Sequence, residues 1–463
     1  MHRSLRHALS AVATSVLGAA LVAVPSPAHA ASSVPGDIDG DGYRDLVVSA
    51  PDAAVGGRAG AGAVVIFHGS ASGLGRRTVL TQDSTGIPGS AEAGDHFGAS
   101  VAVHDMDGNG YNDLIIGAPG EEVYGDVGGG MVTVVRGSST GLGKASVVED
   151  PWPYEHDAWG RTLAVGKFDG YTDNGRPVIA VGSNDNGLYY MPATAGGSWL
   201  GGTGIGFNPQ YGVTSLVARP LGSADELVVS GRGHATDTWG DDGEGSELRT
   251  LVHAQYSTEE RAGGLAVAVG DISGDGSADL VIGNPLEPGA DPGGALGGKV
   301  TVLYGGVSGR VITQSTAGVP GAAEAGDRFG ASVSIGDTDE DGYGDLVIGA
   351  PGENGEAGSV TVIRGSATGL DLSSARNVTQ STAGVPGGSE AGDSFGSSVL
   401  LRDLTKDGAA DLVIGGSGEN AGDGALWFLR GASASGAVSF SAAGVGLSTS
   451  GTPHFGSVST SSR

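Results

Sequence analysis

The stretch Asp37-Ile38-Asp39-Gly40-Asp41-Gly42-Tyr43-Arg44-Asp45, followed by an apolar run, decides how this chain folds. It places carboxylates at positions 1, 3, 5 and 9 of one tight turn. Like charges at this spacing repel each other unless a hard cation lies among them, and Ca²⁺ takes about six to eight oxygen ligands from carboxylates and main-chain carbonyls. We therefore predict a calcium loop in which Tyr43 offers its carbonyl oxygen at position 7.

The same spacing returns four more times along the chain. Each copy has Gly at position 6, which suits a sharp turn, and Leu at position 10, which opens an apolar run, so each loop is predicted to join two strands. The predicted ligands are Asp37, Asp39, Asp41, Tyr43 and Asp45; Asp105, Asp107, Asn109, Tyr111 and Asp113; Asp271, Ser273, Asp275, Ser277 and Asp279; Asp337, Asp339, Asp341, Tyr343 and Asp345; and Asp403, Thr405, Asp407, Ala409 and Asp411.

The loops differ from an EF-hand, which needs a bidentate Glu at position 12 and flanking helices. Position 12 is apolar in all five copies: Val48, Ile116, Ile282, Ile348 and Ile414. The alternative is a solvated Asp-Gly turn without metal, but such a turn does not need four spaced oxygens. We therefore expect about five Ca²⁺ sites on β-hairpin loops.

An aromatic-Gly pair stands eight residues before the first Asp of most loops. Gly263-Gly264 holds this place before Asp271. Two further copies have lost the Asp-rich loop and have Lys167 and Arg219 in place of its first carboxylate, and we call these the worn units. A final copy near the C-terminus has no metal loop after it. The aromatic-Gly pairs are Phe97-Gly98, Trp159-Gly160, Tyr211-Gly212, Phe329-Gly330, Phe395-Gly396 and Phe455-Gly456.

Counting these pairs predicts the architecture. With the Gly-Gly copy, the series gives seven units, and the first unit lacks its own pair because the expected position is His29. The segment at Phe455 would supply the missing strand. An open solenoid needs a polar cap at each end, whereas a terminal strand that completes the first unit implies a closed ring. We predict an all-β, seven-bladed β-propeller whose ring is closed by a C-terminal strand.

Residues 1–30 are typical of an export signal, because Arg3 and Arg6 precede an apolar stretch that ends near Ala28-His29-Ala30. The propeller is then expected to occupy residues 31–463. Removal of two arginines would change the net charge from −28 to −30, and five Ca²⁺ would bring it to about −20. An acidic surface of this kind disfavours nucleic acid and anionic membranes as partners.

The chain has no Cys, so disulfides cannot stabilise it. No later apolar stretch approaches the roughly 20 residues that a membrane-spanning helix needs, and we expect a secreted, extracellular monomer. Gly137-Ser138-Ser139-Thr140-Gly141 matches a nucleophile elbow, but its counterparts after the same strand have Ala at the place of Ser139. We therefore predict no catalytic residues.

Tryptophans gather in or beside the two worn units. Trp152, Tyr154 and Trp239 lie in polar segments, where exposed aromatic rings would stack on a sugar or anchor a protein partner. The alternative is that these rings fill gaps in irregular blades. These three residues are the predicted ligand-binding residues.

The aromatic-Gly pairs, the Asp-rich loops and the following Gly117-Ala118-Pro119 and Gly349-Ala350-Pro351 resemble the FG-GAP repeats of integrin alpha-chain propellers. The resemblance covers residues 34–460. It implies calcium loops on one rim of the propeller and ligands on the opposite face. On this basis we expect a calcium-binding adhesion module for an extracellular protein or glycan. The alternative is an extracellular propeller enzyme, either a polysaccharide lyase or a hydrolase.

Overall fold

The structure is a computed structural model that describes residues 34–154, 157–168, 176–184, 188–192, 203–204, 213–221, 224–232, 248–254, 257–261 and 263–458. The export signal predicted at residues 1–30 lies outside this part of the chain. Two other predictions also fall outside it, namely the ligand-binding Trp239 and the aromatic-Gly pair at Tyr211.

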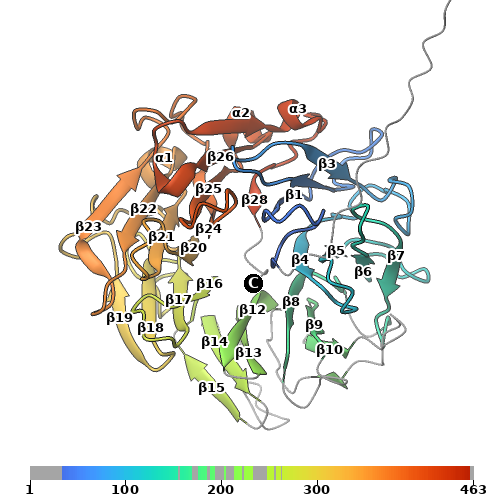
Figure 1. The fold of residues 1–463 in the computed structure, drawn as a ribbon, viewed down its shortest axis with the longest axis horizontal. Helices are drawn as coiled ribbons and strands as arrows, with labels where there is room; N and C mark the ends of the chain where they lie inside the picture. The colour runs from blue at the N-terminus through green and yellow to red at the C-terminus, as the bar shows by residue number, and fades with distance from the viewer. Residues whose placement is uncertain are drawn as a thin grey trace, which may run out of the picture.

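The described residues form an all-β propeller of four-stranded antiparallel sheets arranged around a common centre (Figure 1). In this part of the chain there are seven such sheets, numbered here from first to seventh. They contain β28 (Ser457–Val458), β1 (Leu46–Ala50), β2 (Ala63–Phe67) and β3 (Arg77–Leu80); β4 (Ser100–His104), β5 (Asp113–Ala118), β6 (Met131–Val135) and β7 (Ala145–Val148); β8 (Thr162–Gly166), β9 (Val178–Gly182), β10 (Leu188–Pro192) and β11 (Thr203–Gly204); β12 (Val213–Leu221), β13 (Ala224–Arg232), β14 (Leu248–Ala254) and β15 (Ser257–Arg261); β16 (Ala266–Gly270), β17 (Asp279–Asn284), β18 (Lys299–Tyr304) and β19 (Ser308–Ile312); β20 (Ser332–Gly336), β21 (Asp345–Ala350), β22 (Ser359–Arg364) and β23 (Asp371–Val378); and β24 (Phe395–Arg402), β25 (Asp411–Gly416), β26 (Ala425–Leu429) and β27 (Val438–Ser441).

In the part of the chain that the structure describes, helices are few and short: α1 (Glu353–Glu356), α2 (Glu419–Gly422), α3 (Ala442–Val445) and a 3-10 turn at Arg430–Ala432. Among the described residues, no helix has both the length and the apolar character to cross a membrane.

The second and third strands of most sheets are buried on both faces, which explains their continuous apolar sequences. Their side chains pack against the neighbouring sheets. Between the first and second sheets, for example, Val47 and Ile66 share a core cluster with Phe97, Val101 and Leu114. Hydrophobic burial between adjacent sheets therefore holds the propeller together.

The aromatic-Gly pairs among the described residues pack their sheets against the preceding sheet. The aromatic rings of Phe97, Trp159, Phe329, Phe395 and Phe455 are all fully buried. The following glycine packs directly on the glycine of the preceding sheet's Gly-Ala-Pro motif or of its equivalent. A Cβ added to Gly117 would lie 2.0 Å from the carbonyl oxygen of Gly160, so no larger residue fits there.

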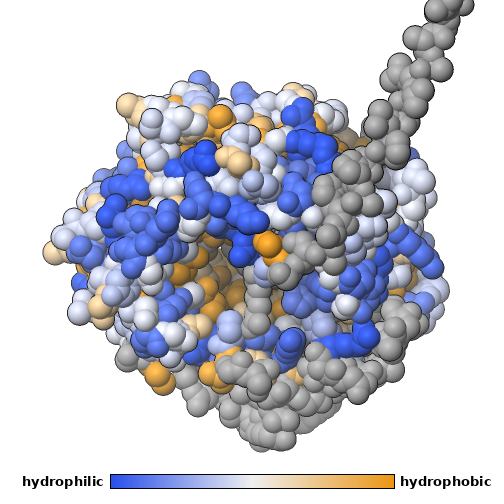
Figure 2. Space-filling model, viewed as in Figure 1, coloured by the Kyte–Doolittle hydropathy of each residue, from blue (hydrophilic) through white to orange (hydrophobic). Residues whose placement is uncertain are grey.

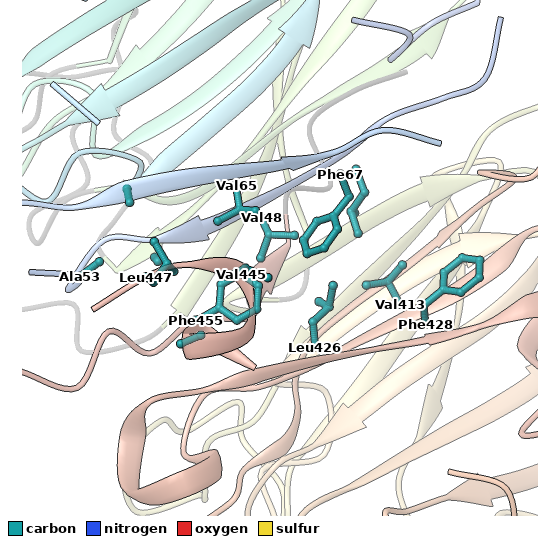
Figure 3. Close-up of a cluster of buried hydrophobic side chains, with 14 of the residues drawn as sticks. Val48, Ala53, Val65, Phe67, Val413, Leu426, Phe428, Val445, Leu447 and Phe455 are labelled. Atoms are coloured by element: carbon teal, nitrogen blue, oxygen red, sulfur yellow. The ribbon is translucent and has the colours of Figure 1, made fainter. Parts of the chain in front are cut away.

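The two ends of the described chain meet in the first sheet. Strand β28 pairs antiparallel with β1 through Val48–Val458 and Ser49–Ser457. The C-terminal sheet lies beside the N-terminal sheet, as the red and blue strands in Figure 1 show. Phe455 packs in one cluster with Val48 and Phe67 of the first sheet and with residues of the seventh sheet such as Leu426 (Figure 3).

The sequence placed Arg219 at the first position of a worn loop, and this placement was wrong. Arg219 lies inside β12, because β12 and β13 are joined through residues 222–223 alone. Its buried guanidinium pairs with Glu226 at 2.8 Å and donates to the carbonyls of Ala278 (3.1 Å) and Gly305 (2.8 Å) in the fifth sheet. The Arg219 side chain therefore joins the fourth sheet to the fifth.

Candidate metal centres and the opposite face

All five Asp-rich loops lie at the same end of the propeller, which we call the loop end. Four of them join the first and second strands of a sheet, namely β4–β5, β16–β17, β20–β21 and β24–β25, and the fifth leads into β1. Because neighbouring strands are antiparallel, the connection between the second and third strands lies at the other end, as does the connection to the next sheet. We call that end the opposite end.

The first Asp of each loop is held by backbone donors of its own turn. Gly40 N–H donates to Asp37 Oδ1 and Gly42 N–H donates to Asp37 Oδ2, both at 2.7 Å. Asp105 and Asp271 accept the equivalent pairs at 2.7 to 2.8 Å. The turn therefore fixes the orientation of this carboxylate before any ion arrives.

The Asp at position 9 is buried in all five loops and ties two segments together. Asp345 Oδ1 accepts from Gly365 N–H (2.9 Å), and Oδ2 accepts from Thr338 N–H (3.1 Å) and from the Thr338 hydroxyl. Burial raises the pKa of Asp45, Asp279, Asp345 and Asp411, and it raises the pKa of Asp113 to about 6. A nearby cation would stabilise the ionised form that burial disfavours.

Carboxylates converge in three of the five loops. Within each of three groups, one oxygen of every member lies within 4.8 Å of the others: Asp37, Asp39 and Asp41; Asp105, Asp107 and Asp113; and Asp337, Asp339 and Asp341. These oxygen donors fit a hard divalent cation such as Ca²⁺. The loops at Asp271 and Asp403 have Ser273 and Thr405 at position 3, and no such group occurs in them within the described residues.

A basic side chain after the third strand reaches the carboxylates of three loops. Arg136 pairs with Asp113 at 2.9 Å and Arg364 with Asp339 at 2.8 Å. In the seventh sheet Arg430 lies 3.2 Å from Asp407. These arginines partly neutralise the negative charge of the loops. A metal cation would therefore have to compete with them for the carboxylate oxygens.

The first sheet has His68 where the second, sixth and seventh sheets have this arginine, and the sequence analysis did not single it out. His68 Nδ1 lies 3.1 Å from Asp39 Oδ2 and 3.5 Å from Asp45 Oδ1. Burial lowers the pKa of His68, but the two carboxylates outweigh this effect and raise it to about 9. The signal in the sequence was the alignment of His68-Gly69-Ser70 with Arg136-Gly137-Ser138.

The structural and metal-binding roles of the loop carboxylates should separate by mutation. In a chelator, Asp345→Ala should lower the free energy of unfolding by about 2–4 kcal/mol, because it leaves buried N–H donors without an acceptor. Asp341→Ala is the matched control: its carboxylate is exposed, so it should cost under about 0.5 kcal/mol in the chelator. With calcium present both variants should be destabilised. Equal losses in the chelator would contradict this division of roles.

Two of the three predicted ligand-binding residues, Trp152 and Tyr154, lie at the opposite end. Tyr154 is 76% exposed, and Trp152 is 42% exposed and stacks on Tyr189 at a centroid distance of 5.4 Å. The structure adds Tyr124 and Val127 of the β5–β6 connection, which are 70% and 79% exposed. A cavity of about 330 Å³ lies at the same end and is lined by Pro51, His96, Ala99, Pro119, Gly120, Ala158 and Arg161.

The Gly-x-Ser-x-Gly match is a strand-to-strand turn between β6 and β7. Ser138 Oγ donates to the carbonyl of Gly141 at 2.7 Å, and Ser70 and Ser366 make the same bond in the first and sixth sheets. A nucleophile elbow instead leads from a strand into a helix. The segment therefore serves as a repeated turn.

The propeller and its five hairpin loops define a class of repeat protein, and comparison with known proteins names the repeat. The FG-GAP repeat model matches residues 29–67, 97–135, 263–303, 329–363 and 395–429. Each match begins at an aromatic-Gly position or its equivalent and includes one Asp-rich loop. The chain therefore contains five FG-GAP repeats.

Known relatives match parts of the chain. It is 44% identical to Xenopus laevis integrin alpha-5 and 45% identical to human integrin alpha-IIb, in each case over 86 residues. It is 34% identical to bovine phosphatidylinositol-glycan-specific phospholipase D over 161 residues. These alignments cover 18%, 18% and 33% of this chain but only 8%, 8% and 18% of the relatives.

Proposed function

We propose that this chain is an exported, calcium-stabilised binding module whose opposite end contacts an extracellular protein or glycan. Residues 1–30 would direct export, and the Asp-rich loops would hold about five Ca²⁺ ions at the loop end. The observation that carries the proposal is that the two ends of the propeller present different kinds of side chain. Carboxylates are preset by backbone donors at one end, while large exposed aromatic side chains gather at the other.

Calcium binding is supported by the donor chemistry and by the repeat family. Three loops bring three carboxylates together, and two loops have a hydroxyl residue at position 3. Because carboxylates that already converge lose less conformational freedom when an ion binds, we expect three tighter and two weaker sites. In this scheme the ions would compensate carboxylates that burial and mutual repulsion otherwise disfavour.

We further propose that the seven sheets act as blades of a closed ring. The pairing of β28 with β1 and the packing of Phe455 between the first and seventh sheets support this arrangement. A closed ring leaves no free inner strand edge, which favours a monomer. It also gives the ligand-binding face a rigid base.

The ligand surface is proposed at the second and third sheets. Tyr124, Val127, Trp152 and Tyr154 lie on connections at the same end, although Trp152 is partly held by Tyr189. Exposed aromatic rings supply large contact area with few rotatable bonds, as binding hot spots require.

Figure 2 shows one face of the propeller as mostly hydrophilic around a hollowed centre with hydrophobic residues on its wall.

A screen against glycans and extracellular-matrix proteins, with and without Ca²⁺, tests the proposal, together with a turnover screen on polysaccharides. We expect calcium-dependent binding without turnover. Turnover of a polysaccharide would instead support the alternative function, an extracellular propeller enzyme.

For any ligand found in this screen, Tyr154→Ala, Trp152→Ala and Trp239→Ala should each weaken binding by more than about 1 kcal/mol. Asp339→Ala at the loop end should lower stability and leave affinity nearly unchanged once Ca²⁺ saturates the other loops. Val311→Ala, an exposed position on β19, is the control for loss of surface apolar area. Isothermal titration measures each affinity, and equal losses for all five variants would contradict the placement of the ligand surface.

A further inference from the structure

We propose that the first sheet carries a second kind of metal site, in which His68 Nδ1 and the carboxylates of Asp39 and Asp45 bind a divalent transition metal such as Zn²⁺. One ligand atom from each of these three side chains lies within 4.8 Å of the others. Zn²⁺ accepts imidazole nitrogen together with carboxylate oxygen, whereas Ca²⁺ takes oxygen ligands. The donor set therefore selects a different ion from the one proposed for the loops.

The orientation of His68 supports this assignment. Its side chain is only 9% exposed, and buried Nδ1 has no hydrogen-bond partner of good geometry while facing Asp39 and Asp45. The other ring nitrogen, Nε2, lies 3.2 Å from Thr78 Oγ1. Without metal the two carboxylates favour a proton on Nδ1, and a bound metal ion would replace this proton while Nε2–H donates to the Thr78 hydroxyl. A hydrogen bond from the second nitrogen is usual for a histidine that ligates a metal.

Among the five sheets that have an Asp-rich loop, only the first has His at this position. The residue aligned with His68 is Arg136, Tyr304, Arg364 or Arg430 in the second, fifth, sixth and seventh sheets. An arginine side chain has donors but no acceptor, so it neutralises a carboxylate and cannot ligate a metal. In the first sheet, His68, whose imidazole can ligate a metal, stands where three other sheets have this positively charged arginine.

The surroundings leave room for the ion and for water ligands. A cavity of about 250 Å³ opens beside Asp39 and His68 and extends to Thr140 of the second sheet. Arg76 also lines it and pairs with Asp39 Oδ2 at 2.6 Å. Because the Arg76 side chain is 63% exposed, it has space to turn into solvent when a metal takes that oxygen.

Asp45 can serve the proposed site without giving up its structural bonds. Its Oδ1 accepts from Gly69 N–H at 3.1 Å and its Oδ2 accepts from Ile38 N–H at 2.8 Å. Each carboxylate oxygen has two lone pairs, so Oδ1 keeps one for the metal. Asp39 and Asp45 are both shared with the first calcium loop, and the test therefore starts from protein saturated with Ca²⁺.

Titration with Co²⁺, which replaces Zn²⁺ and absorbs visible light, tests the site. The Ca²⁺-saturated wild-type chain should bind one equivalent of Co²⁺ with visible bands of a nitrogen- and oxygen-ligated ion. His68→Arg, which copies the other sheets, should lose this equivalent and keep its calcium-dependent melting. His96→Arg is the matched control, because the His96 side chain is only partly exposed and pairs with Asp52 at 3.0 Å outside the cluster. It should bind Co²⁺ like the wild type.

Retention of the Co²⁺ equivalent by His68→Arg, or its loss in His96→Arg, would overturn the proposal. X-ray absorption at the zinc edge of the wild-type chain with one equivalent of Zn²⁺ gives a second measurement, which does not depend on a variant that folds. One imidazole shell together with oxygen ligands is expected. A shell of oxygen alone would show that His68 acts only as a charged partner of the carboxylates.

Discussion

Chelation of divalent cations is expected to lower the free energy of unfolding by about 7 kcal/mol. Each ion that binds only the folded chain, at tenfold above its dissociation constant, adds about 1.4 kcal/mol, and five sites give the sum. This approaches the whole net stability of a typical domain, about 5–15 kcal/mol. The loops hold clustered or buried carboxylates whose repulsion is left uncompensated once the ion leaves.

Melting curves recorded in Ca²⁺ and in EGTA measure this effect. Mg²⁺ in place of Ca²⁺ is the control, because Mg²⁺ demands octahedral geometry and gives up its waters reluctantly. It should restore only part of the lost stability. A melting midpoint that is the same in Ca²⁺ and in EGTA would show that the metal has no structural role.

Deletion of residues 452–463 is expected to cause the second large loss. It removes β28 and the ring of Phe455, which is fully buried between the first and seventh sheets. Truncation of such a buried Phe alone costs about 3–5 kcal/mol, so Phe455→Ala should approach that range and the deletion should exceed it. The exposed edge of β1 should then promote association between chains.

Chemical unfolding and light scattering compare the deletion and Phe455→Ala with Val438→Ala, an exposed apolar position on β27. The control should change the free energy of unfolding by less than about 0.5 kcal/mol. If the deleted chain unfolds at the wild-type midpoint and remains monomeric, the ring is not closed through β28.

Strand positions could be predicted closely from the sequence because the sheets are buried on both faces. The apolar runs expected after the five Asp-rich loops are the strands β1, β5, β17, β21 and β25. Four of the five Asp-rich loops fall between two strands as expected, and the first leads into β1 with no strand before it among the described residues. The prediction for position 9 was incomplete, because it treated this Asp only as a calcium ligand. The Asp also accepts hydrogen bonds from another segment of the chain, as Asp345 does from Gly365 N–H, and the loop sequence does not show these bonds.

Long-range contacts account for what the sequence did not show. Arg219 looked like a worn loop residue, but its partners Ala278 and Gly305 belong to the next sheet. His68 lies 29 residues after Asp39, and only the fold brings its imidazole to that carboxylate. Exposure separates Tyr154 from the buried Trp159, although both are aromatic residues of one worn unit. Composition alone could not distinguish an open surface from a filled core.

The number of calcium ions bound per chain tests the central claim most directly. The chelator-treated chain, dialysed to equilibrium against Ca²⁺ and analysed for metal content, should hold about three ions at low free Ca²⁺ and about five at saturation. Asp337→Ala combined with Asp339→Ala should remove one ion, because both carboxylates belong to one loop. A chain that binds no calcium at millimolar concentration, or an ion count unchanged in this variant, would contradict the account.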